Sequence, residues 1–187
     1  MNKLIRISII SIMMIFFLTL NVCAFENEIY KMNIPSEYAS MSYAGMDVFT
    51  KGKEYGVVIY SFEAVGLKKN LSTMPKSEVN ELLGKVVSKD AKIIEQSKEK
   101  LGKAKSIKAR VLHEESYMDI YIVVSDKHIL LISFVAPNQS ELDSEEYLEI
   151  KKSFKMKERT TNANLVKFGI GAVAVVGAVF KFKNQLF

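Results

Sequence analysis

Apolar segments near both ends of the chain constrain its fold most strongly, because they leave only the middle of the sequence to form a water-exposed domain. The first is "LIRISIISIMMIFFLTL", close to the N-terminus, and the second is "GIGAVAVVGAVF", close to the C-terminus. Such runs are typical of export signals and membrane-spanning helices. The sequence therefore predicts one exported domain between two membrane-directed segments.

The N-terminal segment has the anatomy of a secretory signal peptide, which we place at residues 1–24. Lys3 and Arg6 give it a positive start, and Ala24 ends a small-residue site of the kind that signal peptidases cut. We expect cleavage before Phe25. The alternative is an uncleaved N-terminal anchor, because the apolar run approaches the length of a membrane span.

Cys23 is the only cysteine of the chain and raises a further alternative, acylation as in a bacterial lipoprotein. Val22 precedes it, however, where a lipoprotein signal carries a small residue, so the sequence favours loss of Cys23 with the signal. The mature domain then contains no cysteine. Disulfides and thiolate-based metal sites are thereby excluded.

A transmembrane helix is predicted over residues 165–182, followed by a short cytoplasmic tail at residues 183–187. Apolar residues surround every side of the expected helix, unlike the one-sided pattern of a helix that lies on a surface. The apolar part would rise roughly 24 Å, less than the ~30 Å hydrocarbon core, so flanking lysines would have to extend toward the headgroups. The anchor side chains are Leu165, Phe168, Ile170, Val173, Val176 and Phe180, and the candidate helix-pairing face is Ala174 and Ala178.

The distribution of charge excludes one function that the overall composition invites. The chain carries a formal net charge of +5, a balance often found in nucleic-acid-binding proteins. Residues 25–154 nevertheless hold 18 basic and 20 acidic side chains, so the surplus lies at the two ends. We expect no nucleic-acid partner, and we assign the basic residues beside the C-terminal segment to contact with membrane lipid. The polar stretch "KERTTNAN", residues 157–164, is expected to be a tether between domain and anchor.

Period-two alternation indicates most of the secondary structure in the predicted domain, residues 25–156. The strand "YKMNIP" places alternate residues on one face and ends at Pro35. Pairs of strands are expected around Gly52 and Gly102, and a hairpin is expected over residues 117–136 with its turn at "SDKH".

Two stretches change to the helical period. In "PKSEVNELLGKVVSK" apolar residues recur at i, i+3, i+4, i+7 and i+8, which predicts an amphipathic helix over residues 76–89. "SEEYLEIKKSFK" repeats the pattern behind Ser144, a suitable N-terminal cap. Strands, helix, strands and helix in this order predict an antiparallel β-sheet packed by helices, the α+β class.

The order and spacing of these segments resemble the PsbP-like extracytoplasmic domains, together with the bacterial DcrB-type envelope proteins and a Ran-binding protein of the same fold. The resemblance is carried by "YKMNIPSEY", the helix at residues 76–89, "ARVLHEESYMDIYIVVSDKHILLISFVAP" and "EIKKSFK", and it covers residues 28–155. It implies a PsbP-like fold and a non-enzymatic accessory or binding role. The C-terminal membrane segment departs from this family, so the resemblance implies no particular partner.

Catalytic chemistry has few candidate residues in this sequence. His113 and His128 are the only histidines, and a hydrolase or a metal site built on them is the less favoured alternative. Because no phosphate-cradling glycine loop, serine elbow or zinc-helix motif is present, we expect no enzyme, no metal site and no cofactor.

Another alternative is a surface that binds a small ligand or a glycan through aromatic rings. Its candidate residues are Tyr38, Tyr43, Tyr55, Tyr60 and Tyr117, with Phe49 among them.

Taken together, these patterns favour a non-catalytic, membrane-anchored accessory or binding module of a bacterial envelope complex. It would be a single-pass protein of the cell membrane with its main domain outside the cytoplasm. The expected partners are membrane lipid and another membrane protein.

Overall fold

The structure is a computed structural model that describes residues 22–43, 45–64 and 71–158. The N-terminal apolar run, residues 159–164 of the predicted tether and the whole C-terminal segment lie outside the described residues. The predicted anchor side chains from Leu165 to Phe180 and the predicted pairing face of Ala174 and Ala178 therefore also lie outside them. Within the described ranges, no helix is both long and apolar enough to cross a membrane.

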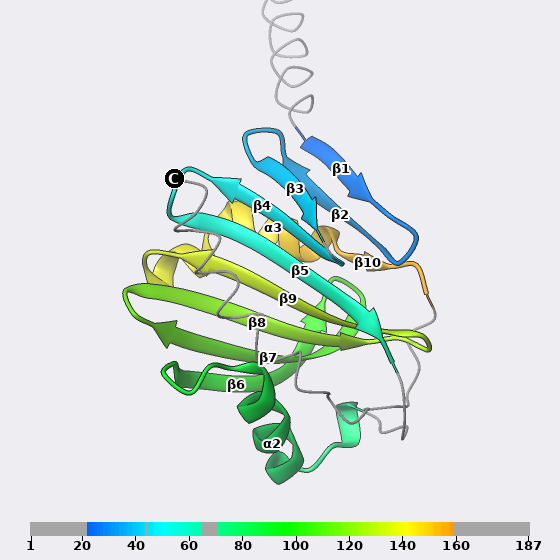
Figure 1. Ribbon diagram of the computed structural model, residues 1–187, viewed down its shortest axis with the longest axis vertical. Helices are drawn as coiled ribbons and strands as arrows, with labels where there is room; N and C mark the ends of the chain where they lie inside the picture. Colours follow the sequence, from blue (N-terminus) through cyan, green and yellow to red (C-terminus); the bar gives the residue numbers. More distant parts are fainter. Residues whose placement is uncertain (1–21, 44, 65–70, 159–187) are drawn as a thin grey trace, which may run out of the picture.

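A seven-stranded antiparallel sheet forms the centre of the domain (Figure 1). Its strand order is β3-β4-β5-β9-β8-β7-β6, so the hairpin partners β8 and β9 lie in the middle. The strands are β3 (Ala39–Tyr43), β4 (Met46–Lys51), β5 (Tyr55–Glu63), β6 (Lys92–Leu101), β7 (Ala104–His113), β8 (Ser116–Val124) and β9 (His128–Ala136). The strand pairs predicted around Gly52 and Gly102 and the hairpin over 117–136 are confirmed.

A second, three-stranded sheet in the order β1-β2-β10 packs beside β3 and β4. It consists of β1 (Val22–Glu26), β2 (Tyr30–Pro35) and the short β10 (Lys155–Met156). The sequence predicted only β2 of these three. Cleavage before Phe25 would leave Phe25 and Glu26 as the remainder of β1, and the Phe25 ring packs edge-on against Phe49, with ring centroids 4.9 Å apart.

Two α-helices cover opposite faces of the large sheet. Helix α2 (Lys76–Val86) follows the 3₁₀ turn η1 (Leu71–Thr73), and α3 (Glu145–Ser153) follows η2 (Gln139–Asp143). Ser144 caps α3 as predicted, because its hydroxyl accepts a hydrogen bond from the Tyr147 backbone amide. Helix α2 stops three residues before the predicted end, since Val87 already has an extended backbone.

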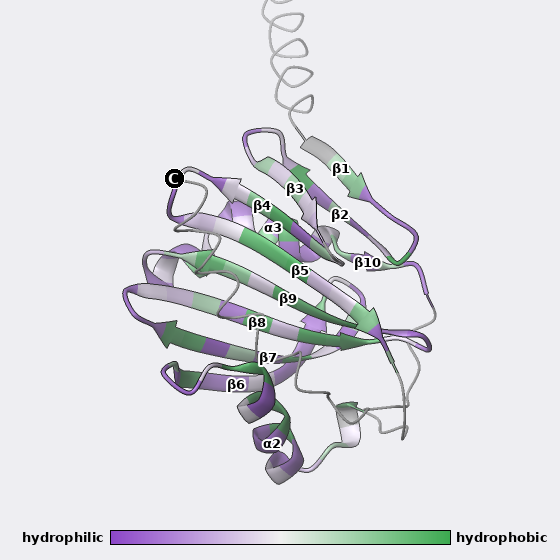
Figure 2. Ribbon diagram, viewed as in Figure 1, coloured by the Kyte–Doolittle hydropathy of each residue, from purple (hydrophilic) through white to green (hydrophobic). Residues whose placement is uncertain are grey.

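The core is divided between the two faces of the sheet. We name the parts the α2-side core, which includes Val79, Leu82, Leu83, Val86, Met118, Ile120 and Ile122, and the α3-side core, which includes Tyr30, Met32, Ile34, Tyr121, Val123, Tyr147, Ile150 and Phe154. Alternation along β8 sends its side chains into both, as the period of two requires. Hydrophobic residues accordingly concentrate in the strands, whereas the turns are hydrophilic (Figure 2). The predicted α+β class with helices packed on an antiparallel sheet is confirmed.

The turn between β6 and β7 is pressed against the end of α3. Gly102 occupies this turn with a φ of +56°, in the left-handed region. A Cβ atom at this position would lie 2.0 Å from the Phe154 carbonyl oxygen. The β6–β7 turn and the end of α3 can approach this closely only because residue 102 is glycine.

Gly102→Ala should therefore lower the free energy of unfolding by at least ~2 kcal/mol, because it adds both backbone strain and a steric overlap. The measurement is urea denaturation of the purified full-length protein in neutral detergent. Gly84→Ala is the matched control: Gly84 lies within α2 with no atom near its missing Cβ, and the change should stabilise by ~0.5–1 kcal/mol. Equal stability of the Gly102 variant and the wild type would contradict the close contact.

Candidate functional site

A basic pocket of about 570 Å³ opens between the β6–β7 hairpin and helix α3. We name it the lysine pocket, because five lysines line it together with two carboxylates, an aromatic ring, a leucine and the turn glycine. Its lining residues are Glu99, Lys100, Gly102, Lys103, Lys108, Tyr121, Asp143, Leu148, Lys151 and Lys152. Its volume is in the range of small-molecule binding sites.

The base of the pocket is organised by Asp119, a carboxylate on β8 that is fully buried. Arg110 on the neighbouring strand β7 binds it with two hydrogen bonds, Nε to Oδ1 at 2.7 Å and Nη2 to Oδ2 at 3.0 Å. Lys151 of α3 donates to the same Oδ2 at 2.9 Å. A buried carboxylate requires such compensation, so Asp119 fixes the helix and both strands relative to one another.

Arg110 and Lys151 extend this network to the segment η2. The Arg110 guanidinium also donates to both oxygens of Asp143, at 2.9 and 2.7 Å. Lys151 donates to the Leu142 carbonyl oxygen at 2.6 Å. Four elements, β7, β8, η2 and α3, thus converge on one cluster of charges.

Lys108 and the Tyr121 ring complete the inner wall. Lys108 Nζ lies 3.5 Å from Asp119 and 3.5 Å from Glu99. It also lies 5.9 Å from the centre of the Tyr121 ring, which Lys151 approaches to 5.8 Å. Lys151 is 5.1 Å from the Phe134 ring centre as well. Ammonium groups over ring faces are stabilised by the ring quadrupole, which helps to hold both lysines in place.

The charges of the cluster shift one another's pKa values in directions set by burial and pairing. Burial alone would raise the pKa of Asp119, but the hydrogen bonds from Arg110 and the nearby charge of Lys151 outweigh it, so the pKa is lowered. The Arg110 hydrogen bonds lower the pKa of Asp143. Burial lowers the pKa of Lys151 despite its ion pair with Asp119, and the nearby charge of Lys108 lowers it further.

The five tyrosines proposed as an aromatic binding surface do not form one patch. Tyr38 is buried, and its hydroxyl donates to Glu146 at 2.6 Å. Tyr55 and Tyr117 are half-buried against the α3-side core, whereas Tyr60 packs against the α2-side core on the other face. Only Tyr43, on the edge strand β3, is mainly exposed, at 66%.

The two histidines lie at opposite ends of the sheet. His113 pairs with Ser116 at the start of β8, whereas His128 follows the other end of β8, where Val124 pairs with Ile129. Eight residues of strand separate these ends, or about 27 Å at the usual rise. A metal or catalytic site shared by His113 and His128 is therefore incompatible with the fold, and no cluster of three metal-ligating side chains occurs among the described residues.

Sequence analysis missed the central pair Arg110 and Asp119, although the sequence contained a signal for it. The loop between β7 and β8 holds only Glu114 and Glu115, and Glu114 adopts a positive φ of 52°. A two-residue hairpin loop fixes the register, which places Arg110 directly opposite Asp119. Two opposite charges at paired positions in otherwise apolar strands indicate a buried ion pair.

Comparison with known proteins identifies the fold. The sequence matches no protein-family model and no curated protein. The solution structure of cyanobacterial PsbP (CyanoP) from Synechocystis matches with a TM-score of 0.50 at 12% identity, over 73% of this chain and 92% of CyanoP. The fold is PsbP-like. This confirms the resemblance noted in the sequence, at the level of fold alone.

Two other solved structures are similar to the PsbP-like domain. The Ran-binding protein Mog1p from Saccharomyces cerevisiae matches with a TM-score of 0.48 at 10% identity, over 75% of this chain and 97% of Mog1p. A protein from Bacteroides thetaiotaomicron matches with a TM-score of 0.49 at 15% identity and covers 69% of this chain. The match spans only 45% of the Bacteroides protein, which is the longer of the two.

Asp119→Asn should lower the free energy of unfolding at pH 7 by about 3–5 kcal/mol, because it leaves buried cations without their carboxylate. The folded pKa of Asp119 lies below its ordinary value of 3.8, so its ionisation stabilises the fold above that pH, and this stabilisation is lost as the pH falls below it. Denaturant unfolding between pH 7 and pH 2 measures both effects.

The wild type should thus lose more stability on acidification than the Asp119→Asn variant. Asp90→Asn, at an exposed position with no ion pair among the described residues, serves as the control and should follow the wild type. Parallel pH profiles for wild type and Asp119→Asn would contradict the role assigned to the carboxylate.

Proposed function

We propose that this protein is a non-catalytic accessory or binding module of a cell-envelope complex, held outside the cytoplasm by a single C-terminal membrane helix. The observation that carries the proposal is how the chain leaves the PsbP-like domain after α3. Its last described residues form hydrogen bonds and an ion pair with the rest of the domain. The connection to the proposed anchor is therefore shorter than the sequence predicted.

Lys157 and Glu158, the first two residues of the predicted tether, both make such bonds. The Lys157 backbone amide donates to the Ile29 carbonyl at 2.9 Å, and its Nζ lies 2.8 Å from Glu26. Glu158 binds His128 Nδ1 at 2.8 Å and also accepts from the Ser125 hydroxyl. His128 thereby has a structural partner at the point where the chain leaves the sheet.

Only residues 159–164 then remain between the domain and the proposed anchor. Six residues span no more than about 22 Å even in a fully extended chain. A domain held so near the bilayer meets partners in the same membrane at a high effective concentration, so modest affinity suffices for assembly. A soluble substrate would gain nothing from this confinement. We therefore propose a membrane protein as the partner, with lipid as a second contact.

The nature of the charged cluster supports a binding role rather than catalysis. Asp119 and Asp143 are engaged by Arg110 and Lys151, and pairing of this kind lowers the basicity that a general base requires. Carboxylates that are held by several strong partners keep fixed positions and are poorly suited to accept a proton from a substrate. The PsbP-like fold itself is compatible with either role, so the preference for binding over catalysis rests on the charged cluster and not on the fold.

Insertion of about forty glycine and serine residues between residues 159 and 164 tests the proximity claim. The longer tether should reduce the yield of crosslinks between this protein and its membrane neighbours, because the effective concentration falls as the reach grows. The measurement is mild crosslinking in native membranes at matched expression.

The matched control carries the same insertion after Phe187, which leaves the tether unchanged and should keep the wild-type yield. Equal crosslinking in the long-tether form would show that proximity to the bilayer is irrelevant. If the protein with an intact C-terminal segment is recovered in the soluble fraction, the proposed membrane anchor is wrong.

A further inference from the structure

We propose that the lysine pocket binds a phosphate group carried by a small molecule or by a lipid headgroup. The site is separate from the membrane-partner role proposed above, and either claim can fail without the other. The proposal rests on the balance of charges in the pocket, on the fixed backbone that carries two of its lysines and on its apolar wall.

The charges at the base of the pocket neutralise one another. Arg110, Lys108 and Lys151 face three carboxylates, which are Asp119, Asp143 and Glu99. All members of this group are joined by ion pairs of 2.7 to 3.5 Å. The base therefore carries no net charge and supplies a rigid platform rather than free cations.

A surplus of positive charge remains at the mouth. Lys152 pairs with Glu149 at 2.6 Å, but Lys100 and Lys103 form no ion pair with any carboxylate of the described residues. These two lysines give the mouth a local positive charge in a domain that holds more acidic than basic side chains over residues 25–154. Their combined charge matches the −1.5 to −2 of a phosphate monoester at neutral pH.

The backbone that carries these two lysines is held in place before any ligand binds. They flank the β6–β7 turn, where Leu101 and Ala104 are buried and Gly102 touches the Phe154 carbonyl. Side chains on a fixed turn lose less conformational entropy on binding than those on a mobile loop. Lysine ammonium groups bind phosphate as point charges and need no special fork geometry.

The opposite wall can accommodate the organic part of the ligand. Leu148 on α3 is 41% exposed, and the Tyr121 ring also lines the pocket, beneath Lys108 and Lys151. A pocket of about 570 Å³ has room for a phosphate with a short carbon skeleton. Inorganic phosphate would use only the mouth, so we expect an ester to bind more tightly.

Calorimetric titration of the full-length protein in neutral detergent tests the proposal, with glycerol 3-phosphate as the soluble probe. We expect saturable binding that weakens as salt is added. Lys100→Gln combined with Lys103→Gln should raise the Kd at least tenfold, while the ion pairs at the base keep the fold intact. Malonate, a dianion without phosphate, and uncharged glycerol should bind at least tenfold more weakly than the ester.

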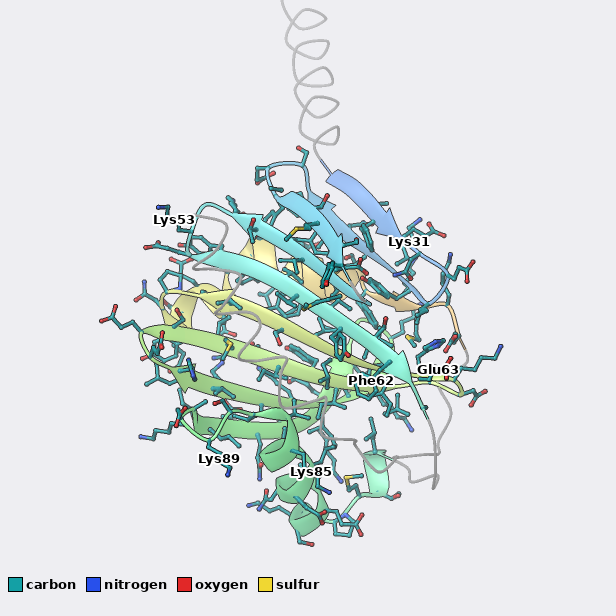
Figure 3. The ribbon with its side chains drawn as sticks, viewed as in Figure 1. Lys31, Lys53, Phe62, Glu63, Lys85 and Lys89 are labelled. Carbon is teal, nitrogen blue, oxygen red and sulfur yellow. The ribbon has the colours of Figure 1, made fainter. Side chains whose placement is uncertain are left out.

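Lys89→Gln combined with Lys92→Gln is the matched control, because it removes the same charge from two exposed positions, Lys89 after α2 and Lys92 at the start of β6 (Figure 3 labels Lys89). This variant should keep the wild-type Kd. Vesicles that contain phosphatidic acid in phosphatidylcholine provide the lipid arm. Binding to these vesicles without binding to the soluble ester assigns the site to a headgroup, and the reverse assigns it to a free ester.

Three results would overturn the proposal. The first is no saturable binding in either arm up to millimolar probe. The second is an unchanged Kd in the Lys100 and Lys103 variant, or an equal loss in the Lys89 and Lys92 control. The third is binding of malonate as tight as that of glycerol 3-phosphate, which would replace a phosphate site by an unspecific anion contact.

Discussion

The carboxylate of Asp119 is the constraint on which the rest of this domain depends. It is buried on the α3 face of the central sheet, where an unpaired charge would cost several kcal/mol. Arg110 reaches it from β7 and Lys151 reaches it from α3. Because Arg110 and Lys151 must both lie within hydrogen-bonding distance of Asp119, α3 can take only one position over the sheet. The α3-side core then packs around a geometry that the charges have fixed.

The same charged residues also form the base of the lysine pocket. Arg110 and Lys151 also bind η2, through Asp143 and the Leu142 carbonyl, so the segment that enters α3 is fixed at the edge of the pocket. At the far end of α3, Gly102 lets the β6–β7 turn touch the helix terminus. A helix held at both ends against a hairpin leaves a hollow between them. Buried paired charges therefore hold the domain together, whereas the lysines that we propose to bind phosphate are exposed.

Local patterns predicted most of the fold, because periodicity reports on burial directly. The apolar spacing of α2 and the alternation along β8 correspond to the two halves of the core. The second sheet was missed, since β10 has two residues and β1 begins within the predicted signal peptide. The end of α2 was placed too late because Val87 continues the apolar pattern after the helix has stopped.

The candidate site was harder to predict, because its contacts join residues distant in sequence. Lys151 and Asp119 are 32 residues apart, and no local pattern links a lysine in an amphipathic helix to an acid in a strand. Only the Arg110–Asp119 pair could have been predicted, because the short loop between β7 and β8 fixes the register of the two strands. The tyrosines suggested a binding surface that the structure does not form. Aromatic residues are common in strands wherever they pack, so their presence alone says little about ligands.

A double-mutant cycle between Asp119→Asn and Lys151→Met measures most directly whether this charge holds α3 on the sheet. The free energy of unfolding of the full-length protein is determined for wild type, both single variants and the double variant. The account predicts a coupling energy of about 2 kcal/mol or more, with the double variant losing clearly less than the sum of the single losses. Additive losses, within about 0.5 kcal/mol, would contradict it.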